Sequence, residues 1–274
     1  MEQSRAGRSV IRWAGKAGLV PAVLLLAACA PFPTVEPGLT FDDGLTAREL
    51  LDRSIEAHGG DLSNDQGEFR LEMTGEWSSA IVRIQPLVTD AGYRIDARER
   101  YRPAERLYIV DHRGPDGVKT IRRQGQDIQV WYDGEVTRDE QVLAASAMTT
   151  DAFELFHFGP SFLKRRAAEL TRLPDRRDEG VRYRRLLALI RPGFGEAAED
   201  QVVVWLDPET DLMYRVHITL NGFETTRGAH VDTTFLEFHR VGAYTLPSRF
   251  VERVRGPIRL RAHDWWITAA EYAP

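Results

Sequence analysis

Alternation of apolar and polar residues is the main pattern of the chain after about residue 68. In the segment 69–77 every second residue is apolar or glycine, and charged residues or threonine fill the positions between. A period of two predicts a half-buried β-strand with one face in water. Similar runs predict further strands at 79–88, 93–101, 106–112, 118–123, 126–132, 181–190, 201–206, 212–220, 230–240, 247–255 and 258–271.

Short turns separate these predicted strands. Gly114-Pro115-Asp116-Gly117 and Asp133-Gly134 are examples of the glycine, proline and aspartate clusters that form tight turns. Strands joined by such turns pair antiparallel, because parallel pairing needs a long crossover. We therefore expect a mainly β (α+β) domain of about ten or eleven strands over residues 46–274.

Two segments have helical spacing instead. The first follows Thr46, which forms a capping box with Glu49, and it ends at Gly59-Gly60. The second lies within 138–172, where Asp151 and Glu154 again have the spacing of a capping box. Gly159-Pro160 is expected to end that helix, and another is expected from Ser161 to Leu170.

The N-terminus has the three zones of a secretory signal peptide. Four basic residues lie within 1–16, an apolar run of twelve residues occupies 17–28, and small residues precede a cleavage point. The run is too short to span a bilayer, which needs about 20 residues. We expect residues 1–28 to be removed.

The cleavage region Leu26-Ala27-Ala28-Cys29 resembles the bacterial lipobox, and Cys29 is the only cysteine of the chain. The resemblance implies a lipid on Cys29. The residue after it is Ala30, which by analogy favours the outer membrane, with the domain facing the periplasm. Residues 29–45 are rich in proline and predict a semi-rigid tether that lets the domain stand off the membrane.

Composition and charge exclude several classes of function. A hydrophobic content of 43% with 28% charged residues is typical of a globular protein. The net charge of −5 argues against nucleic-acid binding, which needs surplus basic residues. A single cysteine excludes an internal disulfide and a multi-cysteine zinc site.

Known catalytic motifs are missing from the sequence. It contains no Gly-x-Ser-x-Gly elbow, no HExxH metal motif and no glycine-rich phosphate loop. We therefore predict no catalytic residue, no metal ligand and no cofactor, and we expect a protein that is not an enzyme. A hydrolase with an unrecognised site stays a third and weaker hypothesis.

Several short motifs along 46–272 resemble the LolA/LolB-like superfamily of lipoprotein-sorting and periplasmic lipid-binding proteins. They are Ala57-His58-Gly59-Gly60, Thr74-Gly75, 129–134, 206–210 and Tyr244-Thr245-Leu246-Pro247. The resemblance implies a strongly curved antiparallel sheet that forms an incomplete β-barrel, with helices closing its open side. It also implies an apolar interior that holds acyl chains.

Large apolar residues are the candidates for lining such an interior. They are Phe69, Leu71, Met73, Trp77, Trp131, Phe153, Phe156, Phe158, Phe162 and Trp205. The same side chains could instead fill a solid core. The segment 150–163 is then either a plug or a movable lid. Phe194, flanked by glycines, is the candidate for a loop that contacts the membrane.

Four arginines could also bind a ligand. Arg94, Arg98, Arg100 and Arg102 share one face of a predicted strand. Their guanidinium groups suit anionic headgroups, or they pair with acids of neighbouring strands on a solvated face.

The leading hypothesis is a monomeric, lipid-anchored envelope protein that binds a lipid or an acylated protein. The alternative is an interaction or sensor module with a filled interior and an envelope protein as its partner.

Overall fold

The computed structural model describes residues 31–35, 38 and 40–274. The predicted signal peptide and Cys29 lie outside these residues, so both stay predictions. The described residues form thirteen strands, more than the ten or eleven predicted. They are β1 (Glu68–Trp77), β2 (Asp96–Arg102), β3 (Leu107–Gly114), β4 (Gly117–Gln124), β5 (Asp127–Tyr132), β6 (Glu135–Val136), β7 (Ala167–Asp178), β8 (Val181–Ile190), β9 (Asp200–Leu206), β10 (Met213–Thr219), β11 (His230–Val241), β12 (Tyr244–Gly256) and β13 (Leu260–Ala273).

All the strands belong to one sheet, in the order β6-β5-β4-β3-β2-β1-β13-β12-β11-β10-β9-β8-β7. Each pair is antiparallel, as the short turns predicted. The first and last strands are neighbours in the middle of the sheet, where Phe69 is opposite Tyr272. The two ends of the sheet do not pair, so the barrel is incomplete, which confirms the predicted fold class.

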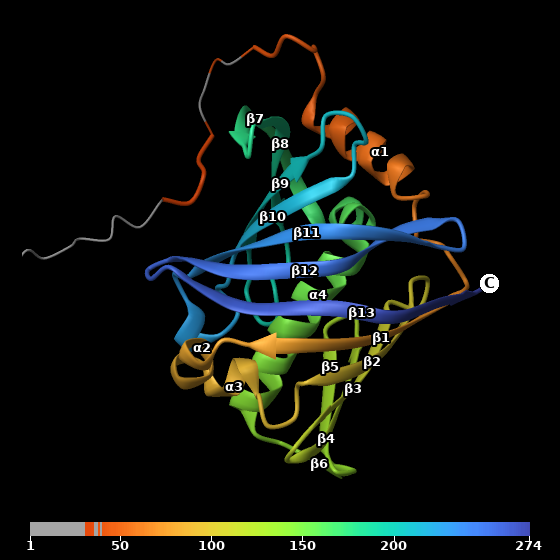
Figure 1. Cartoon of the computed structure of the whole chain (residues 1–274), viewed down its shortest axis with the longest axis vertical. Helices are drawn as coiled ribbons and strands as arrows, with labels where there is room; N and C mark the ends of the chain where they lie inside the picture. Colours follow the sequence, from red (N-terminus) through yellow and green to blue (C-terminus); the bar gives the residue numbers. More distant parts are fainter. Residues whose placement is uncertain (1–30, 36–37, 39) are drawn as a thin grey trace, which may run out of the picture.

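In the described part of the chain, four α-helices accompany the sheet: α1 (Ala47–Ala57), α2 (Ser79–Ile84), α3 (Pro86–Thr89) and α4 (Glu140–Arg166). A short 3-10 helix, η1 (Glu224–Thr226), lies before β11. The long helix α4 contacts β4 and β5 towards one end of the strand order and β8 and β10 towards the other. The sheet therefore curves around α4, which lies on its concave side (Figure 1).

Helix α1 is as predicted. Thr46 accepts a hydrogen bond from the Glu49 backbone, and the Glu49 carboxylate accepts from the Thr46 backbone, so the capping box is present. At the other end His58 joins two strands, because Nδ1 donates to the Thr245 carbonyl and Nε2 accepts from the Met213 backbone. The apolar stripe of α1, including Leu50 and Leu51, is buried.

Helix α4 differs from the prediction in its extent. It is continuous from 140 to 166, and Gly159-Pro160 kinks it at Phe158 instead of ending it. Proline removes one backbone donor and crowds the preceding turn, which bends a helix, but here burial on nearly all sides holds the two halves together. Asp151 lies inside the helix, so the predicted capping box there is wrong, and 167–172 belong to β7.

A buried ion-pair cluster fixes α4 in place. The Asp151 carboxylate lies 3.0 Å from the Arg123 guanidinium of β4 and 3.5 Å from that of Arg166. It also accepts a hydrogen bond of 2.8 Å from the Gly195 backbone. These contacts join the helix to the sheet and to the loop after β8, as expected of a central plug and not of a movable lid.

The segment 79–88 was predicted as a strand and forms helices α2 and α3. Ile81, Ile84 and Val88 are three and four residues apart, which is a helical spacing. Pro86 at the start of α3 also disfavours a strand, because it has no backbone N–H for the ladder.

On the convex side of the sheet, a second apolar cluster gathers around Trp205 and Tyr183. Phe32, from the segment before α1, packs against it. The Phe32 ring lies 4.7 Å from the ring of His217, whose Nε2 is 2.7 Å from Nδ1 of His230. The start of the described chain is therefore seated on the outside of the sheet.

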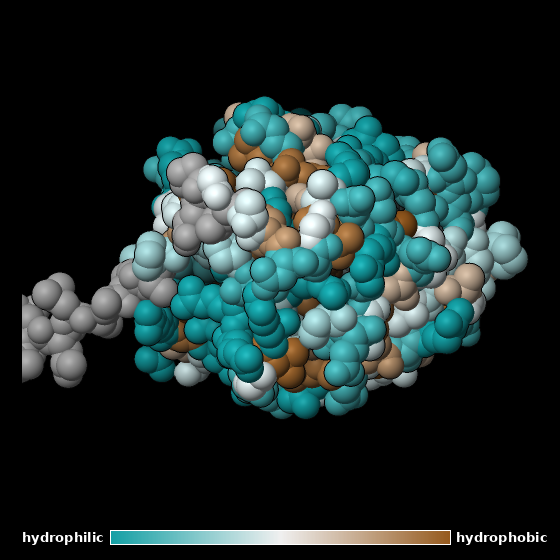
Figure 2. Space-filling view, turned by 90° about the horizontal axis from the view of Figure 1, so that it is seen from above, coloured by the Kyte–Doolittle hydropathy of each residue, from teal (hydrophilic) through white to brown (hydrophobic). Residues whose placement is uncertain are grey.

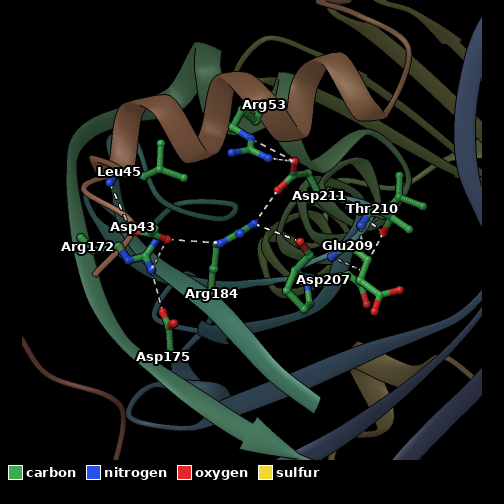
Figure 3. A network of polar contacts seen from close by, with 12 residues as sticks. Asp43, Leu45, Arg53, Arg172, Asp175, Arg184, Asp207, Glu209, Thr210 and Asp211 are labelled. Atoms are coloured by element: carbon green, nitrogen blue, oxygen red, sulfur yellow. Dashed lines mark hydrogen bonds and ion pairs between the residues drawn. The ribbon is translucent and has the colours of Figure 1, made fainter. Parts of the chain in front are cut away.

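A polar network attaches the next part of this segment (Figure 3). Asp43 lies 3.4 Å from Arg172 of β7 and 3.3 Å from Arg184 of β8. Arg184 and Arg53 of α1 both contact Asp211, at 3.1 and 2.7 Å. The end of the molecule that carries α1 and β7 has a mainly hydrophilic surface, with apolar side chains in small areas only (Figure 2).

Candidate functional site

A cavity of about 410 Å³ lies at the end of α4 that is close to α2 and α3. The two short helices form one wall, α4 forms another, and the adjacent ends of β11, β12 and β13 complete it (Figure 1). Its volume is within the range of roughly 300–1,000 Å³ that is usual for small-molecule sites. Apolar side chains dominate the wall, among them Ile81, Val88, Ala152, Phe156, Val231 and Val254.

Apolar side chains also surround its opening. Ile84 of α2 and Ile258 of the β12–β13 turn both line the cavity, yet they are 49% and 41% exposed. Leu87 of α3 is 37% exposed nearby in the chain. Exposed large apolar residues next to a cavity indicate an entrance suited to an apolar ligand.

Hydrogen bonds hold the wall of the entrance together. Gln85, between α2 and α3, donates to the Thr225 carbonyl at 2.9 Å and accepts from the Thr225 hydroxyl at 2.6 Å. Trp77 Nε1 donates to the Arg94 carbonyl at 2.7 Å. The first contact joins the helices to the loop before β11, and the second fixes the indole ring that lines the cavity.

Three charged or ionisable side chains line this cavity: Arg94, Glu252 and His263. Glu252 and His263 are opposite each other on β12 and β13, with 3.3 Å between the carboxylate and Nε2. Burial lowers the pKa of Arg94, and the nearby charge of Asp90 acts against that shift. The site therefore combines an apolar volume with a few polar groups, which is typical of ligand sites.

The structure brings only three of the predicted cavity residues to this site: Trp77, Phe153 and Phe156. Phe69, Leu71, Met73, Phe158 and Phe162 are buried in the solid core around α4. The inward face of β1 therefore packs on the helix instead of lining free space.

The other predicted positions lie elsewhere. Trp131 on β5 is partly exposed, and Trp205 belongs to the cluster on the convex side. Phe194 differs most from its predicted place in an exposed loop. It is fully buried, its ring stacks on Phe162 at 6.0 Å, and its backbone N–H donates to Asp200. The loop folds inward because Gly195, at φ +59°, lies directly against Met148.

The residues that sequence reasoning missed come from 79–89 and 220–231, and also from 148–152 and 252–263. In 79–89, the helical spacing of isoleucine and valine was a usable signal. In 220–231, short polar residues such as Thr225 and Thr226 gave no signal of a cavity. In the part of the chain that the structure describes, no group of three or more His, Cys, Asp or Glu residues is placed to hold a metal. Over the same residues, no helix has the length and apolar character of a membrane span.

Comparison with known proteins gives a likeness of fold alone. The sequence matches no protein-family model and no curated protein. Among solved structures, the chain is similar to a LolA superfamily protein from Nitrosomonas europaea, with a TM-score of 0.48 and 10% identity over 84% of this chain and 92% of that one.

Two further solved structures are reported as similar. A DUF1329 family protein from Desulfovibrio piger has a TM-score of 0.48 and 11% identity, over 82% of this chain and 92% of that one. The lipoprotein LppX from Mycobacterium tuberculosis has a TM-score of 0.27 and 12% identity, over 77% and 96%. A LolA superfamily protein is thus among the similar structures, as the sequence motifs led us to expect.

Proposed function

We propose that this protein binds the hydrocarbon chain of a lipid in the cavity beside α2 and α3. The observation that carries the proposal is the volume of about 410 Å³ with an apolar wall and the exposed Ile84 and Ile258 at its opening. Each methylene group transferred from water into such a site contributes roughly 0.8 kcal/mol before the costs of binding. Chain length should therefore control affinity more strongly than any single polar contact.

The proposed setting follows from the N-terminal motif. With a lipid on Cys29, the domain would be held at the outer membrane and face the periplasm. A binding protein anchored there suits the transport or sorting of lipids or lipoproteins. We propose a non-catalytic role, in which the cargo leaves chemically unchanged.

A second candidate is an interaction or sensor module. It is favoured by α4, which among the described residues fills most of the concave side and leaves the cavity at the end beside α2 and α3. In that case the cavity would be incidental, and envelope proteins would bind elsewhere on the surface.

Displacement of a fluorescent fatty acid from the purified full chain separates the two candidates. We expect saturable binding that weakens as the competing chain is shortened. Ala152→Phe should reduce the affinity at least about tenfold, because the added ring occupies the cavity. Ala198→Phe, at an exposed position, is the matched control and should leave binding unchanged.

Native mass spectrometry of the protein extracted gently from membranes adds an independent readout. Retained lipid and a mass consistent with a lipidated Cys29 would support the proposal. Absence of saturable binding, with Ala152→Phe identical to the unmodified protein, would favour the interaction module.

A further inference from the structure

Arg94 is a buried cation in the wall of the cavity. It lies between α3 and β2, it is 2% exposed, and its guanidinium is 5.2 Å from the Trp77 ring and 5.4 Å from the Phe153 ring. Nη1 donates to the Val88 carbonyl at 2.6 Å, whereas Nε has no hydrogen-bond acceptor among the residues that the structure describes. A guanidinium has five N–H donors, so most of its capacity is unused.

Within the described residues, Arg94 has no carboxylate within ion-pair distance, and the acids whose charges act on it from further away have other partners. Asp90 contacts Lys119 at 2.7 Å and accepts from the Tyr132 hydroxyl. Glu99 lies 3.1 Å from His157. Glu252 lies 3.3 Å from His263.

Lys119 is the informative comparison. Both cations are 2% exposed and belong to the same region, but Lys119 has its own carboxylate and Arg94 does not. A buried charge is costly unless it is paired. Arginine also stays charged in proteins, so it cannot avoid this cost by losing its proton.

Arg94 also differs from the arginines that follow it on β2. Arg98 and Arg102 are exposed and pair with Glu72 at 3.1 Å and Glu68 at 2.7 Å. These two arginines fit the second interpretation of the sequence, in which they pair with acids of neighbouring strands on a solvated face. Only Arg94 among these residues lines the cavity.

We propose that Arg94 receives the acidic headgroup of the bound lipid, and that the ligand is a single-chain lipid with a carboxylate head. The inference rests on the proposed function and names its ligand class. The chain occupies the apolar volume, and the carboxylate supplies the missing counter-charge through charge-assisted hydrogen bonds. Glu252 in the same wall repels additional negative charge, which favours a singly charged carboxylate over a phosphate monoester.

The test compares lipids that share a chain and differ in their heads. Dodecanoate, dodecanol and dodecyl phosphate displace a neutral fluorescent alkyl probe from the full chain at neutral pH, below their aggregation concentrations. We expect dodecanoate to bind at least about tenfold more tightly than dodecanol, because the ion pair forms away from water. Dodecyl phosphate should bind less tightly than dodecanoate.

Substitutions then test whether Arg94 causes the preference for dodecanoate over dodecanol. Arg94→Gln should bring dodecanoate and dodecanol to within about threefold of each other, while dodecanol keeps its affinity. Arg83→Gln, at an exposed position of α2, is the matched control and should retain the preference. Glu252→Gln should strengthen dodecanoate binding by about threefold and leave dodecanol unchanged, because it removes a repulsive charge.

The outcomes separate the two proposals. If no lipid displaces the probe, the proposed function fails and the headgroup assignment fails with it. If all three lipids bind equally to the unmodified protein, Arg94 is not the headgroup site, although the cavity still binds chains. Should Arg94→Gln not fold, the headgroup series and Glu252→Gln decide without it.

Discussion

The two halves of α4 are packed in different ways. Around the C-terminal half, Phe158, Pro160 and Ser161 border a void of only about 10 Å³, enough for a single water at most. Around the N-terminal half, Met148, Ala152 and Phe153 border the cavity of about 410 Å³. The C-terminal half packs against the eleven-residue amphipathic α1. The N-terminal half is covered by the short α3, and the short α2 lies across the cavity from it. The contrast indicates that cavity formation depends on which helices cover α4.

Removing an aromatic ring at the packed end should have the largest effect. Phe162 is fully buried and stacks on Phe194, so Phe162→Ala should lower the free energy of unfolding by about 4 kcal/mol. Phe153→Ala should cost only about 2 kcal/mol, because one side of that ring already faces the cavity. Chemical denaturation measures both, and equal losses would contradict the contrast between the two halves.

Breaking the ion-pair cluster should destabilise both halves together. Asp151→Asn leaves the buried Arg123 and Arg166 without their carboxylate, so we expect a loss of about 3 kcal/mol. Since this cluster holds α4 to the sheet, lipid binding should also weaken. The midpoint of urea unfolding and the displacement assay test the two parts, and unchanged stability would mean that the cluster does not fix α4.

Acid should destabilise the packed end through His58. Burial lowers the pKa of His58 to about 4, although its hydrogen bond to the Thr245 carbonyl acts in the opposite direction. Between pH 6.5 and 4 the unfolded chain takes up a proton that the folded chain does not, so stability falls as pH falls. The contribution is roughly 3 kcal/mol. His58→Gln should flatten the dependence of unfolding free energy on pH in this window, and an unaltered slope would exclude His58 as its source.

The smallest effect is expected at the entrance of the cavity. Gln85→Ala removes both contacts to Thr225, which are near the surface, so the loss of stability should be at most about 1 kcal/mol. Faster release of the fluorescent fatty acid in stopped-flow measurements is the more sensitive readout. If release is unchanged, these bonds do not control entry.

Most strands and α1 could be predicted from the sequence because local patterns determine them. Period-two runs, turn residues and the capping box at Thr46 lie within a few neighbouring positions. The extent of α4 could not be predicted. Gly159-Pro160 is a local signal for a helix end, and burial of α4 on nearly all sides overrides it. The first residues of β7, up to Leu170, were predicted as the end of a second helix, whereas the structure has them paired with β8.

The cavity was predicted as the apolar interior of the curved sheet, and the structure has it at one end of α4. Its wall combines residues distant in sequence, such as Ile81, Ala152 and Val254, and no local pattern indicates that they meet. Arg94 was grouped with the arginines of β2 by spacing alone. Its burial depends on how α3, Trp77 and Phe153 pack around it, which the spacing does not encode.

Phe32 has a consequence for how the domain sits at a membrane. It is the third residue after Cys29, a separation of about 10 Å in an extended chain. A lipid on Cys29, together with Phe32 seated beside His217, would keep the outside of β10 and β11 close to the bilayer surface. The domain would then lie with this face against the lipid headgroups. The proline-rich tether would not hold it away from the membrane.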